Sequence, residues 1–403
     1  MITTEVEDVV IHCLTAAKEI ERLREFWQRA NRHPDVDIDF YSLFVASRAD
    51  TSEPYVVVAT QDGQPRAILV GRLEDATIPI RVGYFALTRI NVRQLTFLHE
   101  GLLRDCNVEI VQAIIVQILS RLREGIADRA VFYNLEVNTE LYRFAKTAPS
   151  IWLRDHSNEF TERWRTTLPA TIDEFLKRRS KKHRYWLRRI GRVFEEEQRG
   201  KVRYGFYHQK CEVGCFCTEA EKVAKQTYQR GLTVGFVNTP DNRERLELAA
   251  DKGWLKAYIV FVEDEPIAFW CGRFYKGVMY LDWTGYNPAY RKQEIGTILF
   301  LKMVEDLCKS GATAIDYGTG AAFYKERFGD QSFAEAVVAI SAPTAKGLAT
   351  AVLKTVDVVA NRFAKSIARK LGIVDRIKRR WRGTLAGTEV KADGDGSAEP
   401  KAE

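Results

Sequence analysis

Residues 258–273 read Tyr258-Ile-Val-Phe-Val-Glu-Asp-Glu-Pro-Ile-Ala-Phe-Trp-Cys-Gly-Arg273, and residues 55–72 read Tyr55-Val-Val-Val-Ala-Thr-Gln-Asp-Gly-Gln-Pro-Arg-Ala-Ile-Leu-Val-Gly-Arg72. In each stretch two apolar runs flank a short polar turn, and each stretch ends in Gly-Arg. Apolar runs on either side of a turn signal such as Asp62-Gly63 are typical of a β-hairpin. The two hairpins predict an internal repeat.

The segments after the two hairpins also correspond. Each hairpin is followed by a further strand, an apolar helix, a buried strand and a short helix. The predicted helix, strand and short helix are 108–122, 130–136 and 140–145 in the first half, and 296–309, 312–317 and 321–328 in the second. A strand–helix–strand unit requires a parallel crossover beside the antiparallel hairpin strands. The predicted fold class is therefore α+β, a mixed α/β sheet that occurs twice in tandem.

The chain of 403 residues is long enough for two such domains with extensions. Apolar residues at spacings of three, four or seven predict a basic amphipathic helix after the second domain, broken at Gly372. The last residues are small, polar and acidic, which favours disorder. The predicted parts are a first domain over 1–165, a second over 166–345, the amphipathic helix over 346–382 and a disordered tail over 383–403.

Composition and charge restrict the setting in which the protein works. The sequence contains no apolar run of membrane-spanning length, no secretory signal and only seven cysteines, so a cytoplasmic location is expected. Segment 346–382 carries eleven Lys and Arg against two Asp, a net charge of +9. An apolar stripe with this charge suits the anionic inner face of a membrane. A helix that packs across the two domains is the alternative interpretation.

A strand, a polar loop and a long helix follow one another in Tyr280-Leu-Asp-Trp-Thr-Gly-Tyr-Asn-Pro-Ala-Tyr-Arg-Lys-Gln-Glu-Ile-Gly-Thr-Ile-Leu-Phe-Leu-Lys-Met303. The backbone N–H groups of 293–298 would lie at a helix N-terminus, where the helix dipole favours an anion. Gly296 would let a ligand approach the backbone closely. Arg291 and Lys292 add positive charge, so the segment predicts a pyrophosphate-binding turn.

This segment resembles the acyl-CoA loop of the GNAT superfamily, Gln/Arg-x-x-Gly-x-Gly/Ala. Gln293 and Gly296 match that pattern, while Ile298 departs from the small residue expected at its end. Farther on, Asp316-Tyr-Gly and Tyr324-Lys-Glu-Arg-Phe-Gly-Asp330 resemble the Fem-type branch, which includes proteins linked to cellulose biosynthesis. The specific resemblance covers about residues 165–345. The first half fits the same fold without these motifs and looks like a degenerate copy.

The resemblance implies an N-acyltransferase that uses acetyl-CoA or another acyl-CoA as substrate, with no metal. It implies Tyr324 as the acid that protonates the leaving thiolate. Asp282 and Asp316 are candidates for the base, with capping or salt-bridging carboxylates as the alternative. Trp283 and Tyr286 would line the acyl channel, unless they are plain core residues. The donor-binding residues would be Arg291, Lys292, Gln293, Glu294, Ile295, Gly296, Thr297 and Ile298.

The acceptor of the acyl group would be an unidentified small-molecule or envelope-related amine. Two other functions stay open. The first is Fem-like aminoacyl transfer from charged tRNA. Segment 177–192 contains nine Lys and Arg and no acidic residue. In this function its basic residues would hold nucleic acid; the alternative is a solvated helix face. The other is a non-catalytic GNAT-fold scaffold at the inner membrane face. Cys211, Cys215 and Cys217 match no common zinc framework.

Overall fold

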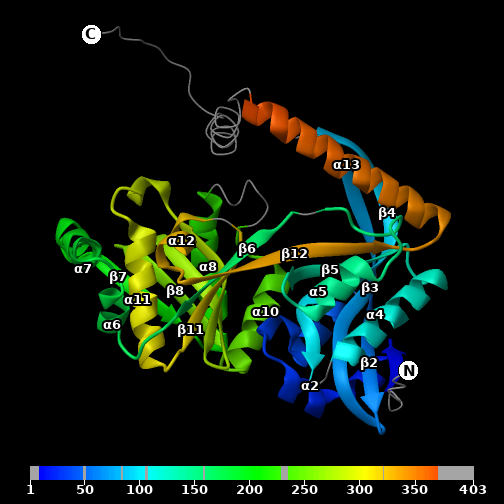
Figure 1. Ribbon diagram of the computed structural model, residues 1–403. Helices are drawn as coiled ribbons and strands as arrows, with labels where there is room; N and C mark the ends of the chain where they lie inside the picture. The colour runs from blue at the N-terminus through cyan, green and yellow to red at the C-terminus, as the bar shows by residue number, and fades with distance from the viewer. Residues whose placement is uncertain are drawn as a thin grey trace. The chain divides into compact units, whose positions relative to one another are not determined.

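The computed structural model describes residues 9–48, 51–82, 85–104, 108–157, 159–227, 235–320 and 322–370. The predicted disordered tail and the predicted break at Gly372 lie outside these residues. The chain forms two compact units, each assembled from segments that are distant in sequence (Figure 1). Of the described residues, unit 1 comprises those up to Ala170, Arg273–Leu281 and Gly311–Lys365, and unit 2 comprises those in Thr171–Gly272, Asp282–Ser310 and 366–370.

The first part of unit 1 is an antiparallel sheet that continues into a parallel crossover. Asp62 and Gly63 have φ angles of 54° and 71°, the left-handed pair that a two-residue hairpin turn requires, so the first predicted hairpin is confirmed. Helix α4 then leads to β5, which runs parallel to β4. The strands are β1 (Val9–Leu14), β2 (Ser52–Gln61), β3 (Gln64–Val82), β4 (Phe85–Arg104) and β5 (Arg129–Glu136); the helices are α1 (Ala17–Glu21), α2 (Arg24–Ala30), the 3-10 turn η1 (Pro34–Val36), α3 (Ile38–Ala46), α4 (Val108–Arg123) and α5 (Glu140–Thr147).

Apolar side chains fill both faces of this sheet. On one face the buried stripe of α4 packs on Phe97 and Phe132, whose rings stack with centroids 4.8 Å apart. On the other face α2 and α3 bury Trp27 and Tyr41. The Trp27 indole N–H donates to the carbonyl of Val36 at 2.6 Å, so its polar atom is satisfied inside the core. Alternating strand residues therefore supply two separate cores.

Later parts of the chain complete the sheet of unit 1. The strands β6 (Thr161–Thr167), β11 (Ala314–Thr319) and β12 (Gln331–Ser341) join it, and the order is β1-β2-β3-β4-β5-β12-β6-β11-β10. Strand β12 is antiparallel to both β5 and β6. Because β12 lies between two strands of the first half, unit 1 includes residues on both sides of the predicted boundary at 165/166.

Unit 2 contains the second hairpin and its helices. Strands β8 and β9 turn through Glu263, which has a φ of 56°, and the order from β10 outward is β10-β9-β8-β7. Helix α11 connects β10 to β11, and these two strands are parallel. The elements are α6 (Ile172–Lys177), α7 (Lys181–Glu197), β7 (Val202–Tyr207), α8 (Lys210–Lys225), α10 (Pro240–Asp251), β8 (Leu255–Val262), β9 (Glu265–Tyr275), β10 (Val278–Tyr286), the 3-10 turn η2 (Pro288–Tyr290) and α11 (Ile295–Lys309).

Each half thus has a hairpin, a third strand, a helix, and a strand parallel to the third. This order confirms the mixed α/β sheet and its tandem repeat. The short helix α12 (Phe323–Phe328) follows β11, as α5 follows β5. Within the described ranges, every helix is too short or too polar to cross a lipid bilayer.

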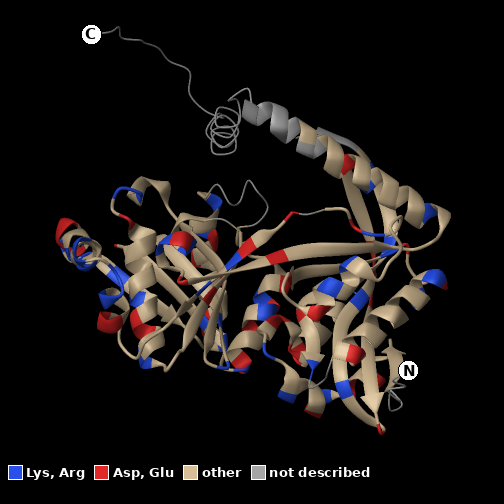
Figure 2. Cartoon of the chain, in the orientation of Figure 1, with Lys and Arg blue, Asp and Glu red and all other residues tan. Residues whose placement is uncertain are grey.

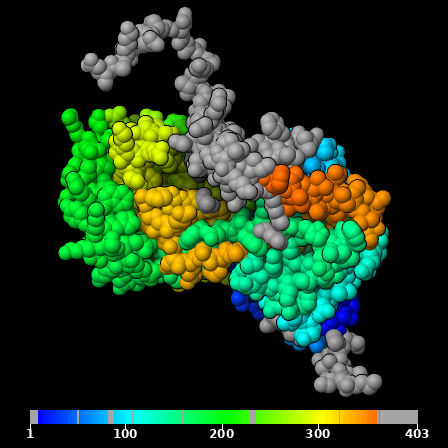
Figure 3. Space-filling view, turned by 45° about the horizontal axis from the view of Figure 1, so that its top comes forward, coloured from blue at the N-terminus to red at the C-terminus, as the bar shows by residue number. Residues whose placement is uncertain are grey.

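The amphipathic helix is α13 (Ala345–Lys370), and it lies on the surface of unit 1 (orange in Figure 3). Ala351 and Asp357 face inward and are buried. Val352, Val356 and Val359 are 57%, 58% and 59% exposed, so one side of the predicted apolar stripe has no covering within the described residues. The remainder of the predicted helix, 371–382, lies outside the described residues.

Candidate donor site and a buried ionic network

The predicted donor loop reverses direction immediately before α11. Pro288 starts the turn η2, and the side chain of Asn287 caps it by accepting the N–H of Ala289 at 2.9 Å. Arg291 and Lys292 follow and are exposed. Glu294 has a φ of 57°, and this left-handed residue turns the chain into the helix.

The hydrogen bonds of the first helical turn decide which N–H groups face outward. The carbonyl of Glu294 accepts the N–H groups of Thr297 at 2.8 Å and Ile298 at 3.1 Å. The Glu294 carboxylate accepts the Thr297 hydroxyl at 2.9 Å. Since the first N–H groups of a helix have no partner within it, the helix leaves the N–H groups of Ile295 and Gly296 unpaired. Ile295 is fully buried, whereas Gly296 is only partly buried, so a ligand would approach this turn at the N–H of Gly296.

Gly296 is not required by the fold. It lies in ordinary helix, and a Cβ built on it would meet only the Tyr286 ring, at 3.7 Å. Glycine inside a helix costs roughly 0.5–1 kcal/mol relative to alanine. The indole N–H of Trp270 donates to the Gly296 carbonyl at 3.1 Å and fixes the turn. An open first turn beside a fixed backbone is the geometry that a close-approaching ligand needs.

A cavity of about 320 Å³ lies in unit 2 between α7 and this loop. Arg189 and Lys292 bring positive charge to it, and Glu197 brings one carboxylate. The side-chain oxygen Oε1 of Gln293 is buried there and has no hydrogen-bond partner among the residues that the structure describes. The apolar part of the lining is Trp186, Ile190, Val193 and Phe194.

Helix α7 carries the basic run that the sequence singled out. Its apolar side is packed into unit 2, with Leu187 and Phe194 almost fully buried. Tyr185 is 65% exposed. Figure 2 marks the positions of basic and acidic residues along this helix in blue and red. The helix therefore combines the packed apolar side of the structural interpretation with a charged side that remains accessible.

The other predicted residues are divided between the units. Trp283 packs edge-to-face on Phe236 at 5.4 Å in unit 2, and Asp282 is partly buried in the same unit. Tyr324 is partly buried in unit 1 and contacts the ring of Tyr317 at 6.1 Å. Asp316 also belongs to unit 1, opposite Tyr280 in the parallel pairing of β10 and β11.

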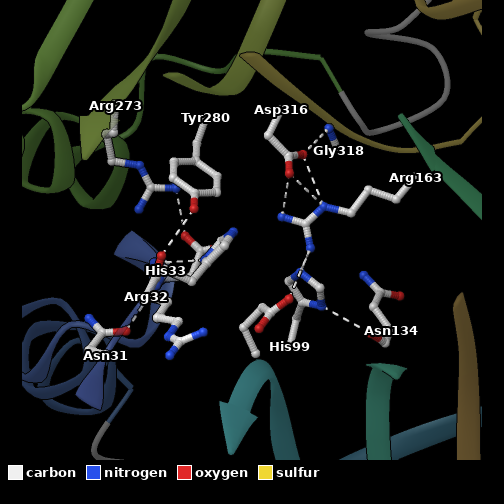
Figure 4. Close-up of polar contacts among 12 residues, drawn as sticks. Asn31, Arg32, His33, His99, Asn134, Arg163, Arg273, Tyr280, Asp316 and Gly318 are labelled. Atoms are coloured by element: carbon white, nitrogen blue, oxygen red, sulfur yellow. Dashed lines mark hydrogen bonds and ion pairs between the residues drawn. The ribbon is translucent and has the colours of Figure 1, made fainter. Parts of the chain in front are cut away.

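Asp316 is buried and bound by a guanidinium (Figure 4). The Nε of Arg163 donates to both carboxylate oxygens, at 3.0 and 2.9 Å, and the N–H of Gly318 donates at 2.9 Å. The Nη2 of Arg163 lies 2.9 Å from the same carboxylate. These contacts fit the alternative interpretation of Asp316 as a salt-bridging carboxylate. To act as a base, Asp316 would first have to be released from Arg163.

Arg163 is the centre of a larger network that the sequence interpretation missed. Its Nη1 also donates to Glu335 at 3.3 Å and to the Nε2 of His99. Because arginine only donates, His99 Nε2 accepts, and its Nδ1 carries the hydrogen that is shared with the Asn134 carbonyl at 3.0 Å. Burial and the Arg163 charge hold the pKa of His99 below its ordinary value, so the ring is neutral at neutral pH.

The pKa values in this network follow from burial. Burial alone would lower the pKa of Arg163, but its carboxylate partners outweigh that effect and raise it. Burial raises the pKa of Glu335 to about 7 against the opposing pull of Arg163. The Oε2 of Glu335 has no partner among the described residues. Lys325 is also buried, which lowers its pKa to about 8, and it donates to the carbonyls of Gly318 at 3.2 Å and Thr319 at 2.6 Å.

A second histidine extends the network. The His33 ring meets the rings of His99 at 5.1 Å and Tyr280 at 4.5 Å, both edge-on. Burial lowers the pKa of His33 well below its ordinary value. Asp35 donates its N–H to His33 and pairs with Arg273 at 2.6 Å. In the sequence, the buried network is indicated only by a charged residue within an apolar strand pattern, such as Glu335 in Phe-Ala-Glu-Ala-Val-Val.

The described residues contain no cluster of His, Cys, Asp and Glu arranged to hold a metal ion. Cys211, Cys215 and Cys217 all lie on α8, and the first two are exposed while the third is buried.

Comparison with known proteins agrees with this architecture. Residues 181–326 match the family model of the acetyltransferase (GNAT) domain, and these residues include the α11 loop. The structure of FemX is similar with a TM-score of 0.54 at 10% identity, covering 82% of this chain and 97% of that one. The C-terminal domain of an Agrobacterium fabrum protein, described as a lysylphosphatidylglycerol synthetase, is similar with a TM-score of 0.50 at 13% identity, covering 84% and 96%. No curated protein matches the sequence. Residues 181–326 therefore match a GNAT acetyltransferase domain, and the similarity to FemX and to the synthetase domain shows that the chain shares their fold.

Proposed function

We propose that this chain is an acyl-CoA-dependent N-acyltransferase whose donor binds at the first turn of α11. The observation that carries the proposal is Gly296. Neither its backbone conformation nor its packing requires glycine, and without a side chain it leaves its own N–H in the first helical turn open beside the exposed Arg291 and Lys292. The positive end of the helix dipole at this turn favours the pyrophosphate of a CoA thioester. The carboxylate of Glu294 accepts the Thr297 hydroxyl within the same turn.

The chemistry needs one base and one acid. The acceptor amine forms a bond to the acyl carbonyl carbon and loses a proton, while the carbon–sulfur bond breaks and the thiolate gains a proton. We propose Tyr324 as the acid. Asp282 and Asp316 are the candidates for the base, and Asp316 would first have to be released from the hydrogen bonds of Arg163 and Gly318. The acceptor would be a small-molecule or envelope-related amine that the protein meets in the cytoplasm or at the inner membrane face.

Calorimetric titration with acetyl-CoA, octanoyl-CoA and free CoA tests the donor site directly. The decisive variant is Gly296→Asp, which places a carboxylate at the proposed anion site. An acid in the first helical turn stabilises a helix, so a loss of binding would not result from unfolding. The matched control is Gly214→Asp in α8, where a helical glycine also has open space around it.

Micromolar binding of acyl-CoA that Gly296→Asp weakens at least about tenfold, with no change in Gly214→Asp, supports the donor site. Equal acyl-CoA affinity in the wild type and Gly296→Asp would refute the assignment of the loop. Failure of every CoA species to bind would refute acyl-CoA dependence.

A second candidate, aminoacyl transfer from charged tRNA, is favoured by α7. Its basic residues form a charged side, and Trp186 in the neighbouring cavity offers a ring that could stack on a base. Filter binding of aminoacyl-tRNA at several salt concentrations tests this candidate. Affinity that falls steeply with salt and drops in Arg189→Glu, without acyl-CoA binding, would replace the first proposal with the second.

A further inference from the structure

Unit 1 contains a second cavity, of about 520 Å³, between α13 and the strands β5 and β12. It is lined by residues of unit 1 and is separate from the residues of the donor loop. Its volume falls in the range of small-molecule sites, about 300–1,000 Å³. The α13 side of the cavity is fixed by Lys354, which donates to the Pro79 carbonyl at 3.2 Å.

Arg129, at the start of β5, brings a cation to this cavity without a salt bridge among the described residues. Its Nε donates to the neutral amide of Gln94 at 2.7 Å. Within the described part of the chain, no carboxylate lies within salt-bridge distance of its guanidinium. Burial is the main cause that lowers the pKa of Arg129, and the Asp155 charge offsets this effect only in part, so the cation lies in an environment that disfavours its charge.

Two carboxylates that line the cavity hold hydrogen bonds or an ion pair with groups other than Arg129. The two oxygens of Asp155 accept the N–H groups of Ser157 at 2.7 Å and Ala339 at 3.2 Å. Asp357 pairs with Lys354 at 2.9 Å. Arg154 is compensated differently, because it donates to the Thr147 carbonyl at the end of α5 and to the Pro149 carbonyl, both at 2.6 Å. Arg129 therefore keeps its guanidinium without a salt bridge among the described residues, and a ligand anion could pair with it.

The cavity wall next to Arg129 is apolar. Val131 and Tyr133 on β5 and Val337 on β12 point to the cavity, and the last two are 41% and 42% exposed. Large apolar side chains left open beside a guanidinium without a salt bridge suit a molecule with one anionic group and an apolar body.

We propose that this cavity binds an anionic amphiphile, whose carboxylate or phosphate group pairs with Arg129 and whose apolar part covers Tyr133 and Val337. The planar guanidinium fork can bind either oxyanion through two parallel hydrogen bonds. The proposal does not depend on the identity of the acyl donor, because the cavity and the donor loop share no residue.

Titration calorimetry with decanoate and decyl phosphate below their micellar concentrations tests the site, with decanol as the uncharged control. The first variant is Arg129→Gln, which removes the charge, and its matched control is Arg66→Gln, an exposed arginine on β3 that does not line the cavity. The second variant is Val337→Trp, which fills the cavity from a position already exposed to solvent and keeps the test valid if Arg129→Gln fails to fold.

We expect saturable one-to-one binding of at least one anion and much weaker binding of decanol. Arg129→Gln should weaken the binding at least about tenfold, as expected for a lost charge-assisted hydrogen bond. Val337→Trp should abolish it, and Arg66→Gln should leave it unchanged. A preference for decanoate over decyl phosphate would assign the head group as a carboxylate, and the reverse preference would assign it as a phosphate. Equal affinities in the wild type and Arg129→Gln, or equal binding of decanol, would overturn the proposal.

Discussion

Replacing Glu335 with glutamine should change how the stability of unit 1 depends on pH. Glu335 is 2% exposed, and its Oε1 receives one hydrogen bond from Arg163 at 3.3 Å. Burial raises its pKa from 4.5 to about 7. The folded state therefore holds a proton at pH values where the unfolded chain has released it. Stability from this group is greatest below pH 4.5 and is lost as the pH rises to about 7.

The size of the effect follows from the two pKa values. A rise from 4.5 to about 7 lowers the free energy of unfolding by about 3 kcal/mol at high pH, and about 2 kcal/mol of this loss falls between pH 5.5 and 8. Glutamine does not titrate, so Glu335→Gln removes this pH-dependent loss of unfolding free energy. Any destabilisation by the new amide itself is the same at every pH. The stability of the variant relative to the wild type should therefore increase by about 2 kcal/mol from pH 5.5 to pH 8.

Urea unfolding followed by hydrogen exchange and mass spectrometry measures this difference. Peptides that cover β6 and β12 report on unit 1 regardless of how unit 2 unfolds. The control is Glu326→Gln, an exposed glutamate on α12 of the same unit. A stability difference between Glu335→Gln and the wild type that stays constant with pH, or that decreases toward pH 8, would refute the reasoning.

Three further predictions concern the network, the proposed acid and α13. Arg163→Met should destabilise unit 1 by about 3–5 kcal/mol in the same exchange measurement, because it leaves Asp316 buried without its cation; a loss below about 1 kcal/mol would contradict this. Tyr324→Phe should slow single-turnover acyl transfer at least about tenfold at unchanged donor affinity, and unchanged turnover would exclude Tyr324 as the acid. The exposed stripe of α13 predicts sedimentation with phosphatidylglycerol vesicles that Val356→Asp together with Val359→Asp abolishes, measured against phosphatidylcholine vesicles. Wild-type protein that stays in the supernatant would favour the alternative in which this stripe packs within the protein.

Much of the fold could be predicted from the sequence because its signals are local. The Asp62-Gly63 turn between apolar runs sets a hairpin whatever surrounds it, and the apolar stripe of α4 repeats within a few turns. The glycine at the start of α11 was visible in the same way. The geometry of the first turn of α11 could not be predicted from the sequence. It depends on the left-handed conformation of Glu294 and on the hydrogen bonds that its carbonyl accepts, which decide which N–H groups remain open.

The ionic network could not be predicted from the sequence. Arg163 meets Asp316 and Glu335 across separations of 153 and 172 residues, and His99 across 64. The alternation of a strand tells which side chains share a face, but it does not tell which strand becomes the neighbour.

The sequence by itself therefore determined the repeated hairpins, the crossover helices and the glycine-led turn of this protein. The tertiary structure alone decided that β12 inserts between β5 and β6, that Asp316 is held by Arg163, and that α13 encloses a cavity beside Arg129. The physical reason is that turns and helix ends are set by neighbouring residues, whereas the pairing of buried charges depends on strand order and register. These arise only when distant segments share one sheet.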